Sequence, residues 1–255
     1  MRLGVLSYVN TLPLTYGLEC GGVPFPGRVV RGEPSVLNDL AARGQLDVTA
    51  VSSVEVARRR PPFEVLPGVC LKATGPVQSV RLFSRVPLAE LAGGRVAITS
   101  ASATSRILLQ VLVDGLRPET VDGEPELTPE VPAALLIGDR ALRDLPGSSY
   151  VYDLSEEWHR TTGKPMVFAM WLARRDFLQE AAQYLEASRR WGVEHRDRVL
   201  AEAERRTGLP RVRLEDYYRV LDYRLDEAGL AGLREFLMRA HLRGLLPEWC
   251  HKVAV

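Results

Sequence analysis

The first part of the chain alternates short apolar strands with amphipathic helices, and this order constrains the fold more than any other feature. Leu3–Ser7 and Leu46–Ser52 predict buried strands, and Pro34 opens a helix over Ser35–Arg43 that Gly44 ends. A strand, a helix and a second strand in this order need a crossover connection. We therefore expect a parallel sheet whose faces are covered by helices.

A second cycle of strands and helices begins near the turn at Gly93-Gly94. Two such cycles could form one wide sheet or two lobes, and periodicity alone leaves both open. The last third of the chain repeats apolar residues three and four apart, which predicts helices. The further predicted strands are Arg28–Arg31, Ser79–Ser84, Arg95–Thr99, Ala133–Gly138, Tyr150–Leu154 and Val167–Leu172, and the further helices are Val54–Arg59, Thr104–Asp114, Glu156–Thr161, Leu178–Arg206 and Glu215–Leu246.

Composition excludes several classes of protein. Hydrophobic residues make up 46%, charged residues 25%, and the net charge is +1, so we expect no nucleic-acid partner and no membrane partner. The cysteines Cys20, Cys70 and Cys250 are odd in number and lack metal-site spacing, which argues against a disulfide framework or a metal. The sequence shows no signal-peptide pattern and no membrane-length apolar run, so we expect a cytoplasmic protein.

Small polar side chains follow four of the predicted strands. These segments are Ser7–Leu12, Ser52-Ser53, Ser100–Ser105 and Gly138-Asp139. Ligands of open α/β sheets bind beyond the carboxyl ends of the strands, where these segments lie. Each segment also has a purely structural interpretation: Asn10 can form a turn, and Asp139 can be a helix N-cap.

The hydroxyl-rich segment before the predicted helix at Thr104 is the densest of the four. Ser102, Thr104 and Ser105 lie where free N–H groups and the helix dipole attract a carboxylate. One hydroxyl would suffice as a cap, so several in succession favour an anion site.

The ordered set of motifs along nearly the whole chain resembles a known family of menaquinone-biosynthesis proteins. No motif is specific alone, but their order is. The motifs are Tyr8–Leu14, Pro34–Asn38, Gly44–Val48, Gly75–Val80, Ser102–Ser105, Ala134–Asp139, Asp153–Trp158, Thr162–Pro165, Phe168–Trp171, Leu221–Asp226 and Gly232–Phe236.

This resemblance implies a periplasmic-binding-protein-like type II fold, with two α/β lobes joined by two crossover strands and a helical C-terminal segment. Residues 1–83 and 173–255 would form one lobe, and residues 84–172 the other. The crossover strands would lie near Ser79–Ser84 and Val167–Leu172. The resemblance implies no cofactor and no metal, and it leaves the oligomeric state open.

The resemblance also implies an activity, the dehydration of chorismate to 3-(1-carboxyvinyloxy)benzoate in the futalosine route. Asn10 and Ser79 match the functional positions of the family and would be catalytic. Our hypothesis is that hydroxyl groups bind the two substrate carboxylates, and that one of these carboxylates accepts the ring proton. The substrate-binding residues would be Ser52, Ser53, Ser102, Thr104, Ser105 and Asp139.

Two other functions stay open. A sister branch of the same fold releases a dihydroxynaphthoate later in the pathway and relies on a histidine in the second lobe. The segment Gly138–Asp144 contains no histidine, which disfavours that branch. A carboxylate-binding protein without chemistry is the third possibility, and it would make the matches at Asn10 and Ser79 coincidental.

Overall fold

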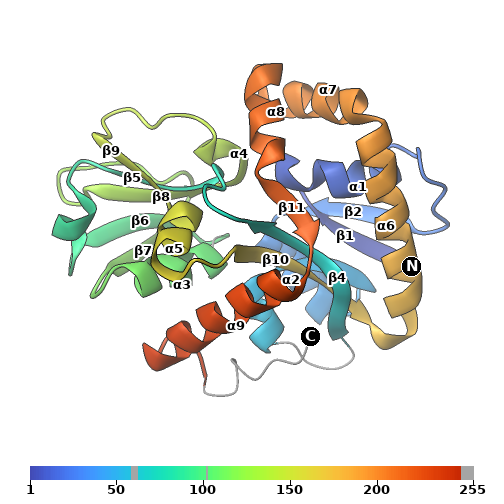
Figure 1. Cartoon of the computed structure of the whole chain (residues 1–255), viewed down its shortest axis with the longest axis horizontal. Coiled ribbons are helices and arrows are strands. Elements are labelled where there is room, and N and C mark those ends of the chain that lie inside the picture. The colour runs from blue at the N-terminus through green and yellow to red at the C-terminus, as the bar shows by residue number, and fades with distance from the viewer. Residues whose placement is uncertain (59–62, 102, 248–255) are drawn as a thin grey trace. The chain divides into compact units, whose positions relative to one another are not determined.

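The computed structural model describes residues 1–58, 63–101 and 103–247 and shows a mixed α/β protein with two sheets (Figure 1). The first sheet has six strands in the order β11-β4-β10-β3-β1-β2, and the second has five in the order β7-β6-β8-β5-β9. The strands are β1 Arg2–Leu6, β2 Arg28–Gly32, β3 Val48–Ser52, β4 Phe63–Ala73, β5 Val80–Ser84, β6 Arg95–Thr99, β7 Arg117–Val121, β8 Ala133–Ile137, β9 Tyr150–Asp153, β10 Met166–Arg174 and β11 Leu221–Arg224.

The predicted parallel pairing is present in both sheets, but each sheet also contains antiparallel pairs. Strand β1 runs parallel to β2 and β3, and β6 runs parallel to β7 and β8. Strand β10 is antiparallel to β3, and β5 is antiparallel to β8 and β9. None of these antiparallel neighbours is consecutive in the chain, so no strand–helix–strand crossover dictates their direction.

Contacts group the chain into two compact units. Of the described residues, unit 1 contains those within 1–71 and 169–226, and unit 2 contains those within 72–168 and 227–247. The chain passes between the units within β4 and again within β10. The crossover predicted at Val167–Leu172 lies within β10, whereas the one predicted near Ser79–Ser84 lies after the first passage, which is within β4. No strand was predicted over β4, whose sequence contains Pro67-Gly68.

In unit 1 the helix α1 (Leu12–Glu19) packs closely on α6 (Leu178–Glu194). A Cβ atom at Gly192 would lie only 2.2 Å from the Pro13 carbonyl oxygen, so glycine is what permits this approach. The Leu18 amide also donates to Ser188 Oγ at 3.3 Å. Helix α2 (Pro34–Ala42) has Pro34 in its first turn, as predicted, and contacts β1 and β3.

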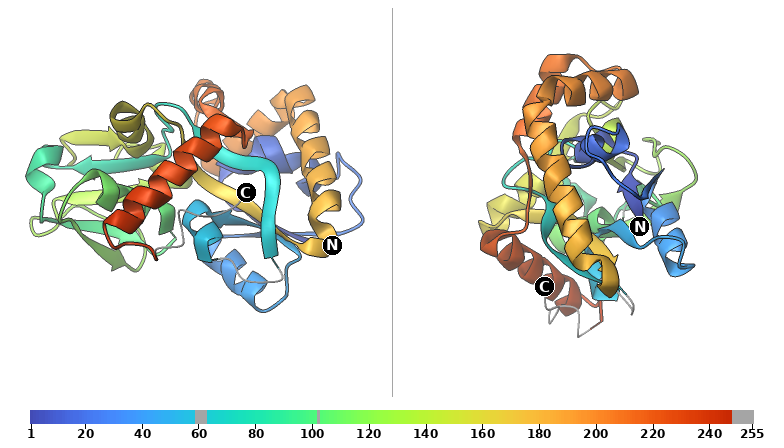
Figure 2. Two further views of the ribbon diagram at one scale, coloured as in Figure 1. Left: turned by 60° about the horizontal axis from the view of Figure 1, so that its bottom comes forward. Right: turned by 90° about the vertical axis from the view of Figure 1, so that its right-hand side faces the viewer.

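The two long helices predicted for the C-terminal third are each interrupted. His195, with φ −115° and ψ 38°, separates α6 from α7 (Arg196–Thr207), and the two helices run in different directions (Figure 2). The predicted helix Glu215–Leu246 divides into α8 (Arg211–Arg219), strand β11 and α9 (Glu227–Leu242). Strand β11 pairs with β4, a long-range interaction that helical periodicity cannot reveal.

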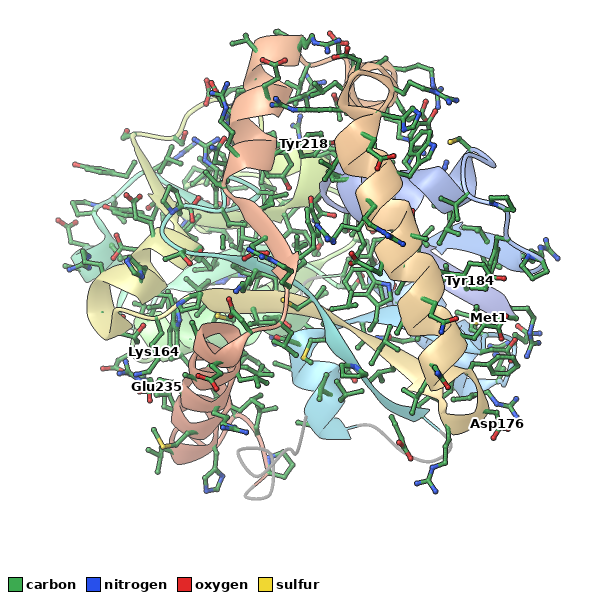
Figure 3. The ribbon with its side chains drawn as sticks, turned by 45° about the vertical axis from the view of Figure 1, so that its right-hand side comes forward. Met1, Lys164, Asp176, Tyr184, Tyr218 and Glu235 are labelled. Carbon is green, nitrogen blue, oxygen red and sulfur yellow. The ribbon has the colours of Figure 1, made fainter. Side chains whose placement is uncertain are left out.

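In unit 2 the helix α9 packs on α3 (Ala103–Leu112). The rings of Trp158 and Phe236 pack edge to face with centroids 6.0 Å apart, and Lys164 forms an ion pair with Glu235 at 3.8 Å (Figure 3). The predicted lobes instead put this helix with the first lobe. The other helices of unit 2 are α4 (Gly138–Ala141) and α5 (Leu154–Thr162).

Four short 3₁₀ helices complete the described residues: η1 Val9–Thr11, η2 Ser53–Arg58, η3 Leu88–Leu91 and η4 Arg175–Phe177. A helix was predicted over Val54–Arg59, and the structure has the 3₁₀ helix η2 there. Arg59 lies outside the described residues. Among the described residues, no helix is both long and apolar enough to span a membrane.

Candidate functional site

The polar segments that follow β1 and β3 lie at one edge of the first sheet. Gly4 pairs with Thr49 in the parallel register of these strands, so their carboxyl ends are neighbours. Asn10 follows β1 in η1 (Val9–Thr11), and Ser52-Ser53 stand at the end of β3, so both segments follow neighbouring strand ends. Ser53 is fully buried and Ser52 half-buried.

The turn that carries Asn10 is held by two phenols from far along the chain. Tyr218 donates its hydroxyl to the Val9 carbonyl at 3.0 Å, and Tyr223 donates to the Asn10 carbonyl at 2.7 Å. Burial raises the pKa of Tyr223 well above its ordinary value, so the phenol keeps its proton and remains a donor. These two hydrogen bonds fix the backbone of the turn and leave the Asn10 side chain for other partners.

The Asn10 side chain is 7% exposed, and its Oδ1 atom has no hydrogen-bond partner among the described residues. An orphan buried acceptor is costly unless something fills it. The site therefore offers one strong acceptor to a hydroxyl or N–H group of a ligand.

Unit 2 has a matching polar edge. The amide of Gly138, after β8, donates to the Ser79 carbonyl at 2.8 Å, which places Ser79 beside the carboxyl end of that strand. Strand β6 runs parallel to β8, so the beginning of α3, with the buried residues Thr104 and Ser105, follows the neighbouring strand. Thr99, the last residue of β6, contributes a second buried oxygen, Oγ1, without a partner in the described part of the chain.

The turn before Ser79 is organised by a single carboxylate, that of Asp153. Its Oδ1 accepts from the Val77 amide at 3.1 Å, and its Oδ2 accepts from the Gln78 amide at 2.6 Å. Gln78 adopts φ +63°, an uncommon conformation for a residue with a side chain. Ser79 is 2% exposed, and its hydroxyl donates weakly to the Val77 carbonyl at 3.5 Å.

Asp153 is also the N-cap of α5. Its Oδ1 accepts from the Ser155 and Glu156 amides at 3.0 and 3.2 Å. Burial raises the pKa of Asp153 above its ordinary value, while the four N–H donors act in the opposite direction. One side chain thus ties the start of a helix to the turn that carries Ser79.

Sequence reasoning missed Asp153, Tyr218 and Tyr223 as supports of the site. An aspartate three residues before Glu156 is a recognisable helix-start signal, but its second role at Val77 and Gln78 has no local signature. The two tyrosines lie more than two hundred residues from the turn that they hold, so no pattern could connect them.

Three residues remain to be described: Asp139 and Ser102 of the predicted site, and Arg81 of β5. Asp139 lies in the first turn of α4, whose N-cap is Ile137, so the N-cap interpretation of Asp139 is wrong because the helix begins at Gly138, two residues earlier than that interpretation requires. Ser102 lies outside the described residues. Arg81 donates to the Ala141 carbonyl at 3.0 Å, and its guanidinium stacks over the Phe83 ring at 4.9 Å.

A family model described as menaquinone biosynthesis matches residues 1–242. The chain belongs to this family. It is 35% identical to the chorismate dehydratase of Thermus thermophilus, over 92% of this chain and 93% of that protein. It is 30% identical to the 1,4-dihydroxy-6-naphtoate synthase of the same organism, over 76% and 73% of the two chains.

Solved structures confirm the fold class of this menaquinone-biosynthesis protein. Protein AF1704 of Archaeoglobus fulgidus superposes with a TM-score of 0.78 at 21% identity, covering 96% of this chain and 98% of that one. The periplasmic aliphatic sulphonate binding protein of Escherichia coli superposes with a TM-score of 0.63 at 17% identity, covering 97% and 88%. The periplasmic-binding-protein-like fold predicted from the motifs is therefore confirmed.

Proposed function

We propose that this chain is a chorismate dehydratase, a hydro-lyase that converts chorismate to 3-(1-carboxyvinyloxy)benzoate and water. The observation that carries the proposal is its 35% identity to a chorismate dehydratase over nearly the full length of both chains. A second chorismate dehydratase, from Campylobacter jejuni, is 31% identical over 66% of this chain. The two dihydroxynaphthoate-forming relatives are 30% and 28% identical.

The reaction asks for positioning more than for strong acid–base groups. A hydrogen leaves the ring carbon that bears the ether, hydroxide leaves the neighbouring carbon, and the ring becomes aromatic. Aromatisation supplies a large driving force, so holding the substrate in a reactive conformation accounts for much of the required rate enhancement. A site of amides, hydroxyls and helix ends is suited to this task.

In this proposal Asn10 and Ser79 contact the departing hydroxyl and the enolpyruvyl group. The buried and unpartnered Oδ1 of Asn10 supports the role, because it can accept the hydrogen bond that a substrate hydroxyl donates. The turn of Ser79 is held by Asp153, which supports a position that must be kept fixed during the reaction.

In this proposal, hydroxyl groups bind the two substrate carboxylates. Thr104 and Ser105 lie in the first turn of α3, where helix amides and the helix dipole favour an anion. Ser52 and Ser53, at the end of β3, take the same role. Ser102 and Asp139 are the other proposed substrate-binding residues. The substrate's own enolpyruvyl carboxylate accepts the ring proton, and we place the reaction in the cytoplasm.

The test is to incubate purified protein with chorismate and to follow the enolpyruvylbenzoate by chromatography and ultraviolet absorbance. We expect turnover that falls by about 100-fold or more in Asn10→Ala and in Ser79→Ala. Asn38→Ala and Ser35→Ala, on helix α2, are matched controls that should keep full activity.

Three outcomes would contradict parts of the proposal. Chorismate binding without turnover would identify a carboxylate-binding protein. Release of a dihydroxynaphthoate from a nucleoside substrate would move the chain to the sister activity. A bell-shaped rate profile that loses one limb in Glu55→Gln, within η2, or in Asp139→Asn would assign the proton to a protein base rather than to the substrate.

A further inference from the structure

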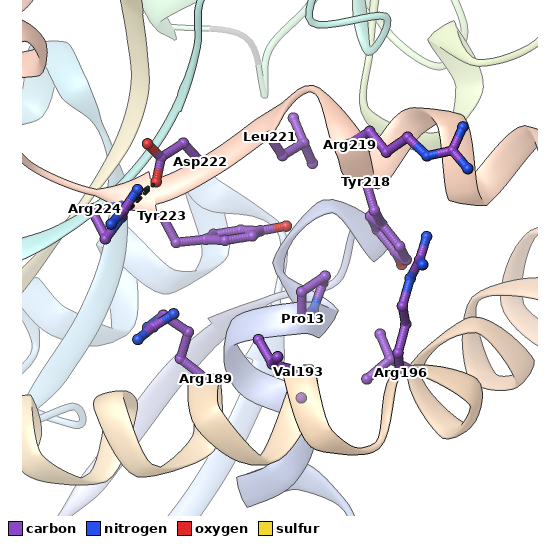
Figure 4. A pocket seen from close by; sticks show the side chains of 12 residues that line it. Pro13, Arg189, Val193, Arg196, Tyr218, Arg219, Leu221, Asp222, Tyr223 and Arg224 are labelled. Carbon is purple, nitrogen blue, oxygen red and sulfur yellow. Dashed lines mark hydrogen bonds and ion pairs between the residues drawn. The ribbon is translucent and has the colours of Figure 1, made fainter.

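Unit 1 contains a pocket that the proposed reaction does not use. Its volume is about 500 Å³, within the range of small-molecule sites. Helices α6, α7 and α8 and strand β11 surround it, together with Pro13 from the start of α1 (Figure 4). Asn10 is not among the residues that line it.

The lining is rich in arginine. Arg189, Arg196, Arg219 and Arg224 border the pocket, and Asp222 is its one acidic residue. Three of the arginines already have carboxylate partners: Arg189 pairs with Glu186, Arg219 with Asp216, and Arg224 with Asp222. The local charges of these three pairs therefore largely cancel.

Arg196 differs from the other three. Its guanidinium forms no ion pair within the parts of the chain that the structure describes, and it extends beside the Tyr218 ring in Figure 4. An arginine that borders a pocket without a protein carboxylate is available for the carboxylate of a ligand, which it can bind through two parallel hydrogen bonds.

The rest of the wall is apolar or aromatic. Tyr218 and Tyr223 present their rings, and Leu221, Val193 and Pro13 add aliphatic surface. Val193 is 68% exposed although it is a large hydrophobic residue, so a ligand that covered it would gain apolar burial. A flat ring with one carboxylate combines the two chemistries that this wall offers.

The same tyrosines connect the pocket to the Asn10 turn. Tyr218 and Tyr223 line the pocket with their rings and donate their hydroxyls to the Val9 and Asn10 carbonyls, at 3.0 and 2.7 Å. A ligand that packs on these rings restricts their motion and hence the motion of the turn. Rigidifying one site can change affinity at another without a large structural change.

We propose that this pocket is a second ligand site, for an aromatic carboxylate, and that its occupancy is transmitted through Tyr218 and Tyr223 to the Asn10 turn. The binding part stands on the pocket alone, whereas the effect on catalysis rests on the proposed function. The site would let an aromatic acid regulate the enzyme from outside the substrate site.

Calorimetry with 2-naphthoate tests the binding part on the full chain. We expect saturable binding that weakens about tenfold or more in Arg196→Ala, the loss of one charged hydrogen-bonding partner. Arg190→Ala, on α6 but outside the pocket lining, is the matched control and should bind like the unaltered protein. The uncharged analogue 2-naphthalenemethanol should bind at least about tenfold more weakly.

Hydrogen exchange tests the coupling without any activity assay. Binding of 2-naphthoate should slow exchange in residues 8–14, and the slowing should disappear in the Tyr218→Phe, Tyr223→Phe double variant while binding persists. Undiminished binding to Arg196→Ala, displacement by chorismate in direct competition, or no binding at about 1 mM would overturn the site. Failure of chorismate turnover would leave these binding results unaffected, so the two proposals fail separately.

Discussion

The turns that carry Asn10 and Ser79 are held in place by different chemistry. Two neutral phenols, from α8 and β11, share the support of the Asn10 turn. One half-buried carboxylate, that of Asp153, supports the Ser79 turn and caps a helix as well. Support that is divided between neutral donors tolerates the loss of one of them. Support concentrated in one charged acceptor fails when that acceptor is removed or altered.

The largest effect should follow from removing that acceptor. Asp153→Ala leaves four N–H groups without their partner and also removes an N-cap, so we expect a loss of about 3 kcal/mol of unfolding free energy. Activity should fall with it, as Ser79 loses its fixed position. Denaturant unfolding and the chorismate assay measure the two effects. Asp144→Ala, at a side chain 97% exposed, is the control and should change neither.

The close approach of α6 to α1 helps to hold the Asn10 turn, which directly precedes α1. In Gly192→Ala the new methyl group would meet the Pro13 carbonyl at 2.2 Å, and α1 must shift to relieve the contact. We expect a loss of about 2 kcal/mol by thermal unfolding, and a raised KM because α1 begins beside the Asn10 turn. Glu194→Ala, exposed on the same helix, should stay within about 0.5 kcal/mol of the parent. If Gly192→Ala changed neither the thermal stability nor the KM, α1 would be free to move without cost and the prediction would be wrong.

Acid should weaken the ion pairs that Glu202 forms with Arg205 and Arg206 in unit 1. Arg205 and Arg206 lower the pKa of Glu202 from 4.5 to about 2. Its folded pKa is below its unfolded value, so its contribution is full above about pH 4.5 and is lost as the pH falls toward 2. We expect Glu202→Gln to reduce stability by about 1.5 kcal/mol at pH 7 and to reduce it much less near pH 2. An equal reduction at both pH values would contradict the assignment.

The smallest effect should come from one phenol. Tyr223→Phe removes the hydrogen bond to the Asn10 carbonyl and keeps the ring, for an expected cost of about 1 kcal/mol. Turnover should fall only a few-fold, because Tyr218 still holds the neighbouring carbonyl. Tyr150→Phe, at a half-exposed ring of unit 2, serves as the control. A loss as large as that of Asp153→Ala would remove the contrast between the two turns.

Many of the local elements, and the family, could be predicted from the sequence. Apolar runs predicted β6 at its observed bounds and β1 and β8 within one residue, because a buried strand is apolar along most of its length. Strand β9 was also predicted within one residue, although none of its residues is buried. The order of the motifs predicted the fold that the solved structures confirm. Polar residues after the predicted strands indicated candidate ligand-binding segments, and their role in binding stays a prediction.

The hydrogen bonds that hold the Asn10 and Ser79 turns could not be predicted, because their donors and acceptors are far apart in the sequence. Strand β11 exists because β4 pairs with it, and Asp153 matters because two amides more than seventy residues away point at it. Tyr218 and Tyr223 hold the Asn10 turn, although they lie more than two hundred residues from it in the sequence. The same two tyrosines line the pocket that is rich in arginine. Local propensity and periodicity act over a few residues, whereas hydrogen bonds between distant segments form only when the whole chain has folded.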